Sequence, residues 1–294
     1  MDSEIPFVSV VIPTYRDWER LQLCIDALAK QTYPADKFEI LVINNDPSES
    51  ALEAFCLPVN GKLFVESRVG SYAARNKGIK ESRGQILAFT DSDCIPAPGW
   101  IENAVAILIS GADRIGGKVE LFYSSNRLNL AEKYQKAFAF RQENSTARGF
   151  SVTANMLTWL DVFDKVGLFD DLLMSGGDYE WGVRAYNAGF GITYSPNVIV
   201  RHPARHQLSA LLHKRRRTTG GIAAIKKSEG TIEFLGRFAR GFMPPIFGYM
   251  NIRNRTDLSV EEKICALCVL YLAKIYGAIH YFLSFLKLCP QKRC

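Results

Sequence analysis

The sequence lacks the regularly spaced cysteine pairs of a disulfide-rich or zinc-binding protein. Its seven cysteines are scattered, and their odd number and irregular spacing predict reduced, mostly buried thiols rather than a disulfide framework. The single CxxC pair, Cys265 and Cys268, lies inside an apolar run and has no second pair of candidate ligands, so it does not favour a zinc site.

A basic leader, internal repeats and low-complexity segments are also missing. The chain begins with the acidic segment MDSE, which does not resemble a signal peptide, so we expect the protein to stay on the cytosolic side. Hydrophobic residues make up 48% of the chain and charged residues 22%, which excludes a disordered or collagen-like protein. The 294 residues can bury a full core.

The charge is unevenly distributed along the chain. Residues 200–294 carry 17 Lys and Arg against 5 Asp and Glu, whereas the preceding residues have an acidic excess. This asymmetry indicates an anionic partner for the C-terminal third, either nucleic acid or anionic lipid. The basic run at 214–217 (KRRR) has no interleaved aromatic residues and no known reading motif, which argues against nucleic acid.

An apolar stretch at residues 264–288 is long enough to span a bilayer. Lys274 lies near its middle, where a charge costs about 2.5–3.5 kcal/mol on insertion scales. The pattern favours an interfacial helix, while a spanning helix, a core helix and a homodimer interface stay open. We therefore expect a cytoplasmic protein that is peripheral on the cytosolic face of a membrane.

Short β-branched apolar runs alternate with segments of helical periodicity. The runs at 7–12, 38–43 and 85–90 predict buried strands, and the run at 62–65 predicts a further strand. The segments at 17–31, 48–57 and 70–82 predict helices. This alternation predicts an α/β fold with an open, mostly parallel sheet. Further elements are expected as helices at 97–110, 127–143 and 179–188, and as strands at 116–122 and 191–200. Residues 213–227 are strongly basic, and residues 232–249 are amphipathic and broken by Pro244-Pro245.

Polar residues follow three of the predicted strands. Ligands of open α/β sheets bind outside the carboxyl ends of the strands, so these residues should line one crevice. They are Thr14, Tyr15 and Arg16; Asn44, Asn45 and Asp46; and Asp91, Ser92 and Asp93.

Asp91 and Asp93 are candidate metal ligands. Separated by one residue, they project to the same side of an extended segment. Hard carboxylate oxygens suit Mg²⁺ or Mn²⁺, whose shells are often completed by substrate phosphates. His202 ends a strand and is a candidate third ligand. The alternatives are a turn at residues 91–93 and a structural role for His202.

Three further side chains are candidates for chemistry. Asp178 follows two glycines and precedes a predicted helix, so it is either a functional carboxylate or an N-cap. Arg75 and Lys77 either neutralise a phosphate or lie on a solvated helix face.

Four segments, in order, resemble motifs of family 2 glycosyltransferases. They are residues 8–15 (VSVVIPTY), 73–78 (AARNKG), 89–93 (FTDSD) and 177–185 (GDYEWGVRA). The resemblance covers about residues 7–220 and implies a GT-A fold at 1–220, followed by a helical extension at 221–294 that associates with a membrane or another subunit.

The resemblance also implies roles for individual residues. Asp93 matches the direct metal ligand of the DxD motif, and Asp178 matches the general base of this inverting family. The nucleotide-sugar site would comprise Pro13, Thr14, Tyr15, Arg16, Asn44, Asn45, Asp46, Arg75, Lys77, Asp91 and Ser92. A loop beside the donor sugar and acceptor would include Thr153 and Asn155, together with Gly177, Glu180 and Trp181.

Three departures from the family pattern refine these expectations. Asn44 stands where an acidic residue is frequent, and Gly177 stands where a glutamate usually precedes the catalytic aspartate. Residues 214–218 (KRRRT) lack the tryptophan of the QxxRW motif of processive synthases, which favours transfer of a single sugar.

We therefore expect an inverting, Mn²⁺- or Mg²⁺-dependent transferase that uses a nucleotide sugar, with a UDP-sugar favoured. Its acceptor would be a hydroxyl of a glycan or lipid-linked molecule in cell-surface polysaccharide or glycoconjugate synthesis. The alternatives are an inactive nucleotide-sugar binder and a basic protein that binds nucleic acid or a membrane surface. A nucleotidyltransferase is disfavoured because no glycine-rich phosphate loop follows the first strand.

Overall fold

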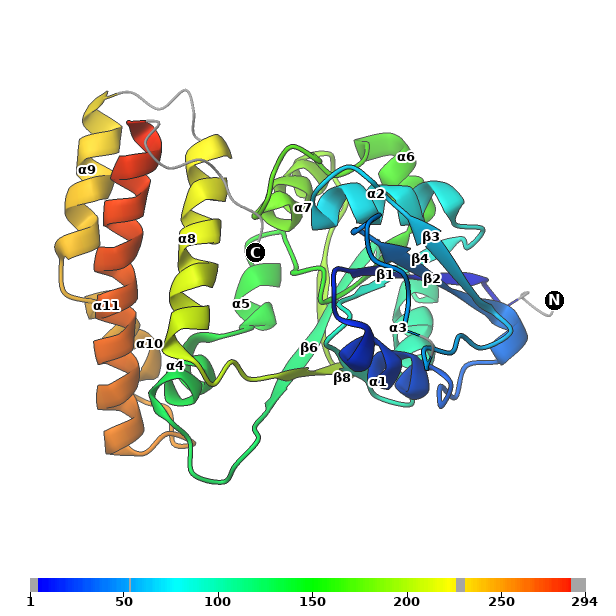
Figure 1. Ribbon diagram of the computed structural model, residues 1–294, viewed down its shortest axis with the longest axis horizontal. Coiled ribbons are helices and arrows are strands. Elements are labelled where there is room, and N and C mark those ends of the chain that lie inside the picture. Colours follow the sequence, from blue (N-terminus) through cyan, green and yellow to red (C-terminus); the bar gives the residue numbers. More distant parts are fainter. Residues whose placement is uncertain (1–4, 53, 226–230, 287–294) are drawn as a thin grey trace. The chain divides into compact units, whose positions relative to one another are not determined.

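The computed structural model describes residues 5–52, 54–225 and 231–286 (Figure 1). The chain divides into two compact units. The first draws on residues 1–120, 140–172 and 177–202, and the second on residues 121–139, 173–176 and 203–294. The domain boundary predicted after residue 220 falls inside helix α8 (Leu208–Ile225).

Four parallel strands form one side of the sheet in the first unit. They are ordered β3-β2-β1-β4, and Val8 is paired with both Phe38 and Ile86. The β1, β2 and β4 strands are buried along their whole length, as their continuous apolar runs predicted. The strands are β1 (Val8–Thr14), β2 (Phe38–Asn44), β3 (Gly61–Val65) and β4 (Ile86–Thr90).

The sheet continues beyond β4 with antiparallel pairing. Strand β7 (Asn155–Trp159) runs antiparallel to β4 and to β6 (Arg114–Phe122). Strands β8 (Thr193–Pro203) and β5 (Ile95–Pro96), also antiparallel to each other, complete the eight-stranded sheet. The predicted α/β fold is confirmed, and β7 is an element that the sequence analysis did not predict.

Helices cover both faces of the parallel strands (Figure 1). Val10 and Ile12 point into a core shared with α1 (Trp18–Leu28) and α3 (Trp100–Ile109). Val11 points to the opposite face, as strand alternation requires, and meets α2 (Ser71–Glu81). A Cβ on Gly78 of α2 would lie 2.4 Å from the Val11 side chain, so glycine permits this close approach.

Two helix predictions are wrong. The described residues between 48 and 57 form no helix, because the Gln22 side chain bonds the backbone of Cys56 and holds this segment in an irregular path. The helix predicted at 127–143 is interrupted by Phe140, whose φ of 48° is not helical. It is replaced by α4 (Leu130–Phe138) and α5 (Gln142–Thr146), and two further helices are α6 (Leu160–Val166) and α7 (Gly177–Asn187).

The second unit is helical. It contains α4, α8, α9 (Thr231–Phe242), α10 (Ile246–Ile252) and α11 (Val260–Phe285), and α11 packs against each of the others. Pro244 and Pro245 separate α9 from α10, as predicted.

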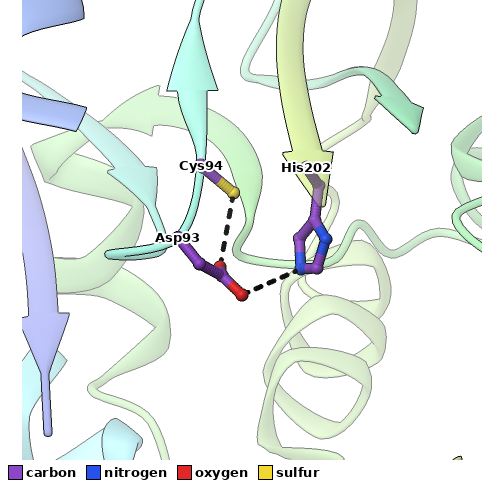
Figure 2. A group of neighbouring side chains, drawn as sticks. All are labelled: Asp93, Cys94 and His202. Atoms are coloured by element: carbon purple, nitrogen blue, oxygen red, sulfur yellow. Dashed lines mark hydrogen bonds and ion pairs between the residues drawn. The ribbon is translucent and has the colours of Figure 1, made fainter. Parts of the chain in front are cut away.

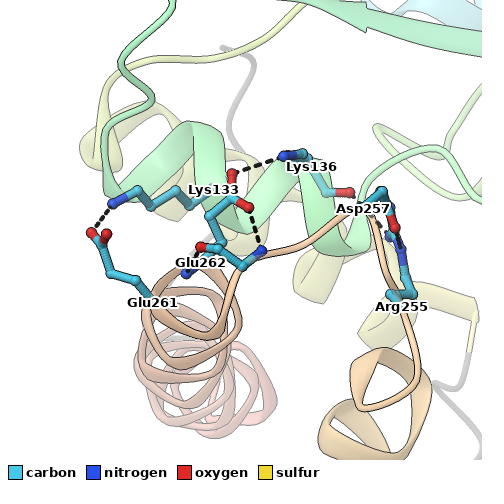
Figure 3. A network of polar contacts seen from close by, with 7 residues as sticks. Lys133, Lys136, Arg255, Asp257, Glu261 and Glu262 are labelled. Carbon is cyan, nitrogen blue, oxygen red and sulfur yellow. Dashed lines mark hydrogen bonds and ion pairs between the residues drawn. The ribbon is translucent and has the colours of Figure 1, made fainter.

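Charged side chains fix the start of α11 in this unit (Figure 3). Ser259 caps the helix, and Glu262 returns a hydrogen bond to the Ser259 backbone. Glu261 pairs with Lys133, and Glu262 pairs with Lys136 at 2.8 Å. These contacts join α11 to α4.

Helix α11 is long and apolar enough to cross a membrane over residues 260–284, with one third of its most apolar window buried. Buried helices of soluble proteins meet the same criteria, so this is weak evidence for membrane association.

The cysteines differ from expectation in their exposure. Cys24 and Cys94 are buried, but Cys56 and Cys268 are exposed. All cysteines in the described residues are free thiols, which fits the predicted reduced state, and Cys289 and Cys294 lie outside those residues.

Candidate active site

The two aspartates that follow β4 point to different partners. Asp91 Oδ1 accepts a 2.5 Å hydrogen bond from Nη2 of the buried Arg75 on α2. Asp93 Oδ2 lies 3.5 Å from His202 Nε2. The pairing of Ile95 in β5 with Arg201 in β8 brings Asp93 to His202.

Asp93, Cys94 and His202 form a group that could hold a metal ion (Figure 2). Their ligand atoms all lie within 4.8 Å of one another. Adjacent ligands of an octahedral Mg²⁺ are about 3 Å apart, so a small shift would bring Asp93 and His202 onto one ion. The buried ring of His202 packs on Phe140 at 4.6 Å between centroids, which fixes its orientation.

Cys94 suits this ion less well than its neighbours. Burial, followed by the charges of Asp91 and Asp93, raises the pKa of its thiol well above the ordinary value. A protonated sulfur is a poor ligand, whereas Mg²⁺ and Mn²⁺ prefer oxygen, and imidazole nitrogen is acceptable to Mn²⁺. The donor set therefore fits Mn²⁺ or Mg²⁺ through Asp93 and His202. Arg20, whose guanidinium lies 3.6 Å from Asp93, compensates part of the local negative charge.

Asp178 lies in the first turn of α7, where its carboxylate meets Tyr72 of α2. Tyr72 Oη donates a 3.1 Å hydrogen bond to Asp178 Oδ1, which also accepts from the backbone N–H of Tyr179. Burial raises the pKa of Asp178 above its ordinary value, although the charge of Arg75 and these hydrogen bonds oppose the rise. Groups that transfer protons in enzymes commonly have pKa values shifted in this way.

Gly177 explains one departure from the family pattern. A Cβ at this position would lie 2.8 Å from the Tyr72 ring. Any larger residue, including the glutamate usual in the family, would displace Tyr72 from Asp178. The tyrosine therefore occupies the space made by the glycine.

Arg75 connects the two halves of the site. Its guanidinium bonds Asp91, lies 5.7 Å from the centroid of the Tyr72 ring, and lowers the pKa of Asp178. A chain of side-chain contacts thus runs from the end of β4 to the start of α7. It links Asp91 to Arg75, Arg75 to Tyr72, and Tyr72 to Asp178.

Arg114, a residue not predicted from the sequence, bonds the backbone of α7. It is fully buried, and its guanidinium donates to four backbone carbonyls, including those of Gly182 and Gly149 at 3.1 Å. Burial lowers the pKa of Arg114 to about 10. No sequence pattern distinguishes such an arginine from a surface one.

The ends of β1 and β2 are joined by an ion pair. Arg16 Nε donates to Asp46 Oδ2 at 2.6 Å, and Ser48 and Arg16 together lower the pKa of Asp46 to about 2. Arg16 has a φ of 52°, an uncommon conformation for a residue other than glycine. Thr14 is buried, and its hydroxyl has no hydrogen-bond partner within the described residues.

Asn44 and Asn45 use their amides to shape this edge. Asn44 Oδ1 accepts from the Asp46 N–H at 2.9 Å, and its amide donates to the carbonyls of Asp46 and Glu49. Asn45 bonds the backbone of Glu66, Arg68 and Gly70. Both side chains thus bond the chain itself, and their place in the nucleotide-sugar site stays a prediction.

Three of the remaining predicted site residues bond other side chains, and the other two are described by their position. Lys77 pairs with Glu81 at 2.7 Å, Glu180 pairs with Arg184 at 2.9 Å, and Ser92 donates to Asp17 at 3.1 Å. Pro13 lies in β1, directly before its last residue Thr14, and Thr153 is buried.

Asn155 and Trp181 lie in the core, and their predicted contacts with the donor sugar or acceptor are not supported. Asn155 is fully buried in β7, where its amide bonds Trp100, Lys118 and Val198. Trp181 is also fully buried and stacks on Phe163. The physical reason is that Asn155 begins the buried strand β7 and Trp181 lies on the buried side of α7.

The sequence and the fold are similar to those of known glycosyltransferases. The family model for glycosyl transferase family 2 matches residues 9–166. The chain is 40% identical to glycosyltransferase AglE of Haloferax volcanii over 75% of this chain and 74% of the relative.

A second relative is a Methanococcus voltae protein named dolichyl N-acetyl-alpha-D-glucosaminyl phosphate 3-beta-D-2,3-diacetamido-2,3-dideoxy-beta-D-glucuronosyltransferase. It is 19% identical over 81% of this chain and 79% of its own length.

A solved structure has a similar fold. It is the mannosyltransferase PcManGT from Pyrobaculum calidifontis in complex with GDP-Man and Mn²⁺. The TM-score is 0.63 at 15% identity, covering 96% of this chain and 88% of that one, and the predicted GT-A fold is confirmed. The chain belongs to glycosyl transferase family 2.

Proposed function

We propose that this chain transfers one sugar, with inversion, from a nucleoside diphosphate sugar to a hydroxyl group, with a UDP-sugar as the favoured donor. The observation that carries the proposal is the convergence of Asp178, Arg75 and Asp91 beside the Asp93–His202 pair. A base, a cation and a candidate metal site thus occupy one end of one sheet.

Mn²⁺ or Mg²⁺ would be held by Asp93 and His202. When bound, such an ion offsets the charge that develops on a diphosphate leaving group. Asp91 is bonded to Arg75, so we assign it to positioning that arginine rather than to direct coordination.

Asp178 is the proposed general base. Its carboxylate accepts the proton of the acceptor hydroxyl as that oxygen attacks the anomeric carbon. One displacement inverts the configuration at that carbon. Tyr72 and the Tyr179 N–H orient the carboxylate.

The acceptor is proposed to be a glycan or a lipid-linked molecule of cell-surface glycoconjugate synthesis. Two facts support a lipid-linked one: the name of the Methanococcus voltae relative contains a dolichyl-linked sugar phosphate, and residues 200–294 carry a strong positive balance. We place the protein in the cytoplasm, peripheral on an anionic membrane surface, and do not assign it a nucleic-acid partner.

A panel of nucleotide sugars tests the proposal. Each donor is incubated with Mn²⁺ or with EDTA, and donor hydrolysis and the thermal shift of the protein are recorded. We expect one donor to be hydrolysed and to stabilise the protein only with the metal. Binding of a nucleotide sugar without any turnover or transfer would instead favour the inactive-relative alternative.

A further inference from the structure

The helical unit contains a hollow of about 290 Å³ among α8, α9 and α11. This volume lies near the lower end of the range for small-molecule sites, so it suits a headgroup rather than a whole nucleotide sugar. Its lining includes Arg215, Arg237, Arg240, Lys274, Gly277 and Tyr281. Four of its lining residues are cations, and none of the lining residues is acidic.

Three of these cations bond only backbone carbonyls within the described residues. Arg215 Nε donates to Ala273 at 3.2 Å, Arg240 Nε to Gly236 at 3.1 Å, and Lys274 Nζ to Met243 at 2.8 Å. Like charges that line one hollow repel one another, and an anion bound among them would offset this repulsion. Arg215 is also largely desolvated, and burial lowers its pKa.

Gly277 sets the position of the Arg215 guanidinium. A Cβ at Gly277 would lie 2.5 Å from Arg215 Nε, so alanine there would push the guanidinium out of place. The arginine therefore reaches the hollow through a space that only glycine leaves.

Exposed apolar side chains lie at the end of α9, in the turn that follows it and in α10. Phe247 of α10 is 81% exposed, and Phe242, Met243, Ile246 and Met250 are each more than 40% exposed. Lys274 bonds the carbonyl of Met243 and so links the hollow to this apolar segment. Cations next to exposed apolar residues are typical of a surface that enters the lipid interface.

We propose that this hollow binds the phosphate of a membrane lipid, while the lipid chain lies against the apolar segment at residues 242–250. Arginine and lysine donate charge-assisted hydrogen bonds to the phosphate oxygens. The inference deepens the proposed function and rests on its membrane association, but it concerns binding and not sugar transfer.

Vesicle binding by the full-length chain tests this inference without any donor. Cosedimentation is measured with phosphatidylcholine vesicles and with phosphatidylcholine vesicles that contain phosphatidic acid. The Arg240→Gln/Lys274→Gln variant is compared with Arg253→Gln/Lys263→Gln, which removes the same charge at positions outside the lining. Circular dichroism establishes that both variants are folded.

We expect the Arg240→Gln/Lys274→Gln variant to bind phosphatidic acid vesicles at least about tenfold more weakly than the wild type. Each of the two substitutions removes charge-assisted hydrogen bonds to the phosphate. The control variant should lose far less. Equal losses in both variants would overturn the inference in favour of general surface charge. Tight binding of inorganic phosphate that displaces the protein from vesicles would show a site for free phosphate and would also overturn it.

The result is separable from that of the donor panel. Donor turnover with no pocket-dependent lipid binding would refute this inference alone. Lipid binding with no turnover of any donor would refute the proposed transfer alone.

Discussion

The Tyr72 hydroxyl and the Asp178 carboxylate are joined by a 3.1 Å hydrogen bond between α2 and α7. Gly177 makes the contact possible, because a Cβ there would strike the tyrosine ring. Burial raises the pKa of Asp178, and the tyrosine bond lowers it. If Asp178 is the base, as proposed, Tyr72 acts through it as a positioning residue.

Removing this hydroxyl should change the pH dependence of transfer. The base works as the carboxylate, so the rate falls when the pH drops through its pKa. Tyr72→Phe removes a donor that lowers this pKa, so the acidic limb of the kcat profile should move to higher pH. We also expect kcat at neutral pH to fall roughly tenfold, the usual effect of losing a hydrogen bond to a charged group.

Tyr186→Phe is the matched control, because Tyr186 is an exposed tyrosine on α7, the helix that carries Asp178. Its pH profile should overlay that of the wild type. If the pH profile of Tyr72→Phe also overlays that of the wild type, Tyr72 does not tune the pKa of the base.

The metal requirement should depend on His202 and little on Cys94. His202→Ala removes an imidazole ligand, so the Mn²⁺ concentration for half-maximal transfer should rise by at least about tenfold. Cys94→Ser should change it far less, because burial keeps the thiol protonated. A Mn²⁺ titration of both variants checks this, and the reverse order would assign the sulfur as the ligand.

A buried carboxylate on β2 stabilises the opposite end of the sheet. Glu39 is almost fully buried and accepts hydrogen bonds from the Ser9 hydroxyl and from the backbone and side chain of Arg83. Burial opposes ionisation of Glu39, but these bonds prevail and lower its pKa. Ser9 Oγ also accepts from the Gly84 N–H at 2.9 Å.

Ser9→Ala should therefore lower the free energy of unfolding by about 2 kcal/mol at neutral pH. Because the folded-state pKa of Glu39 is lowered, its stabilisation is present above the unfolded pKa and is lost as the pH falls through the folded one. The difference between variant and wild type should shrink in acid. Urea unfolding at neutral and at acidic pH measures this difference in the free energy of unfolding. A difference that is equally large in acid would exclude the charge of Glu39 as its source.

Asp178 should reduce stability at neutral pH. Its folded-state pKa is raised, so the folded state prefers the neutral carboxyl and becomes less stable as the pH rises through that pKa. Asp178→Asn keeps a side-chain oxygen for Tyr72 but carries no charge. We expect its urea midpoint to exceed that of the wild type at pH 7 and to match it below the unfolded pKa. A variant less stable than the wild type at pH 7 would show that the buried charge is well compensated.

The sequence predicted the parallel strands and the outline of the site. Continuous apolar runs ending in polar residues identify β1, β2 and β4, because strands buried on both faces leave few polar positions. The Asp93–His202 pair was predicted from residue type and position at strand ends, and the structure brings the two together.

What the sequence could not predict depends on contacts between distant segments. Strand β7 was missed because its buried polar residues, such as Asn155 and Thr158, obscure an apolar run. Arg114 and Tyr72 have no local signature, since their roles depend on carbonyls and a carboxylate far away in the chain. Asn155 was assigned to a loop, whereas its amide bonds hold neighbouring strands together.

The most direct test of the central claim is sugar transfer by Asp178→Asn with the donor found in the nucleotide-sugar panel. Donor binding is measured by calorimetry with Mn²⁺, and transfer is measured by product formation under the same conditions. The account predicts that the variant binds the donor with unchanged affinity and forms no product. Product formation at the wild-type rate would contradict the assignment of Asp178 as the base.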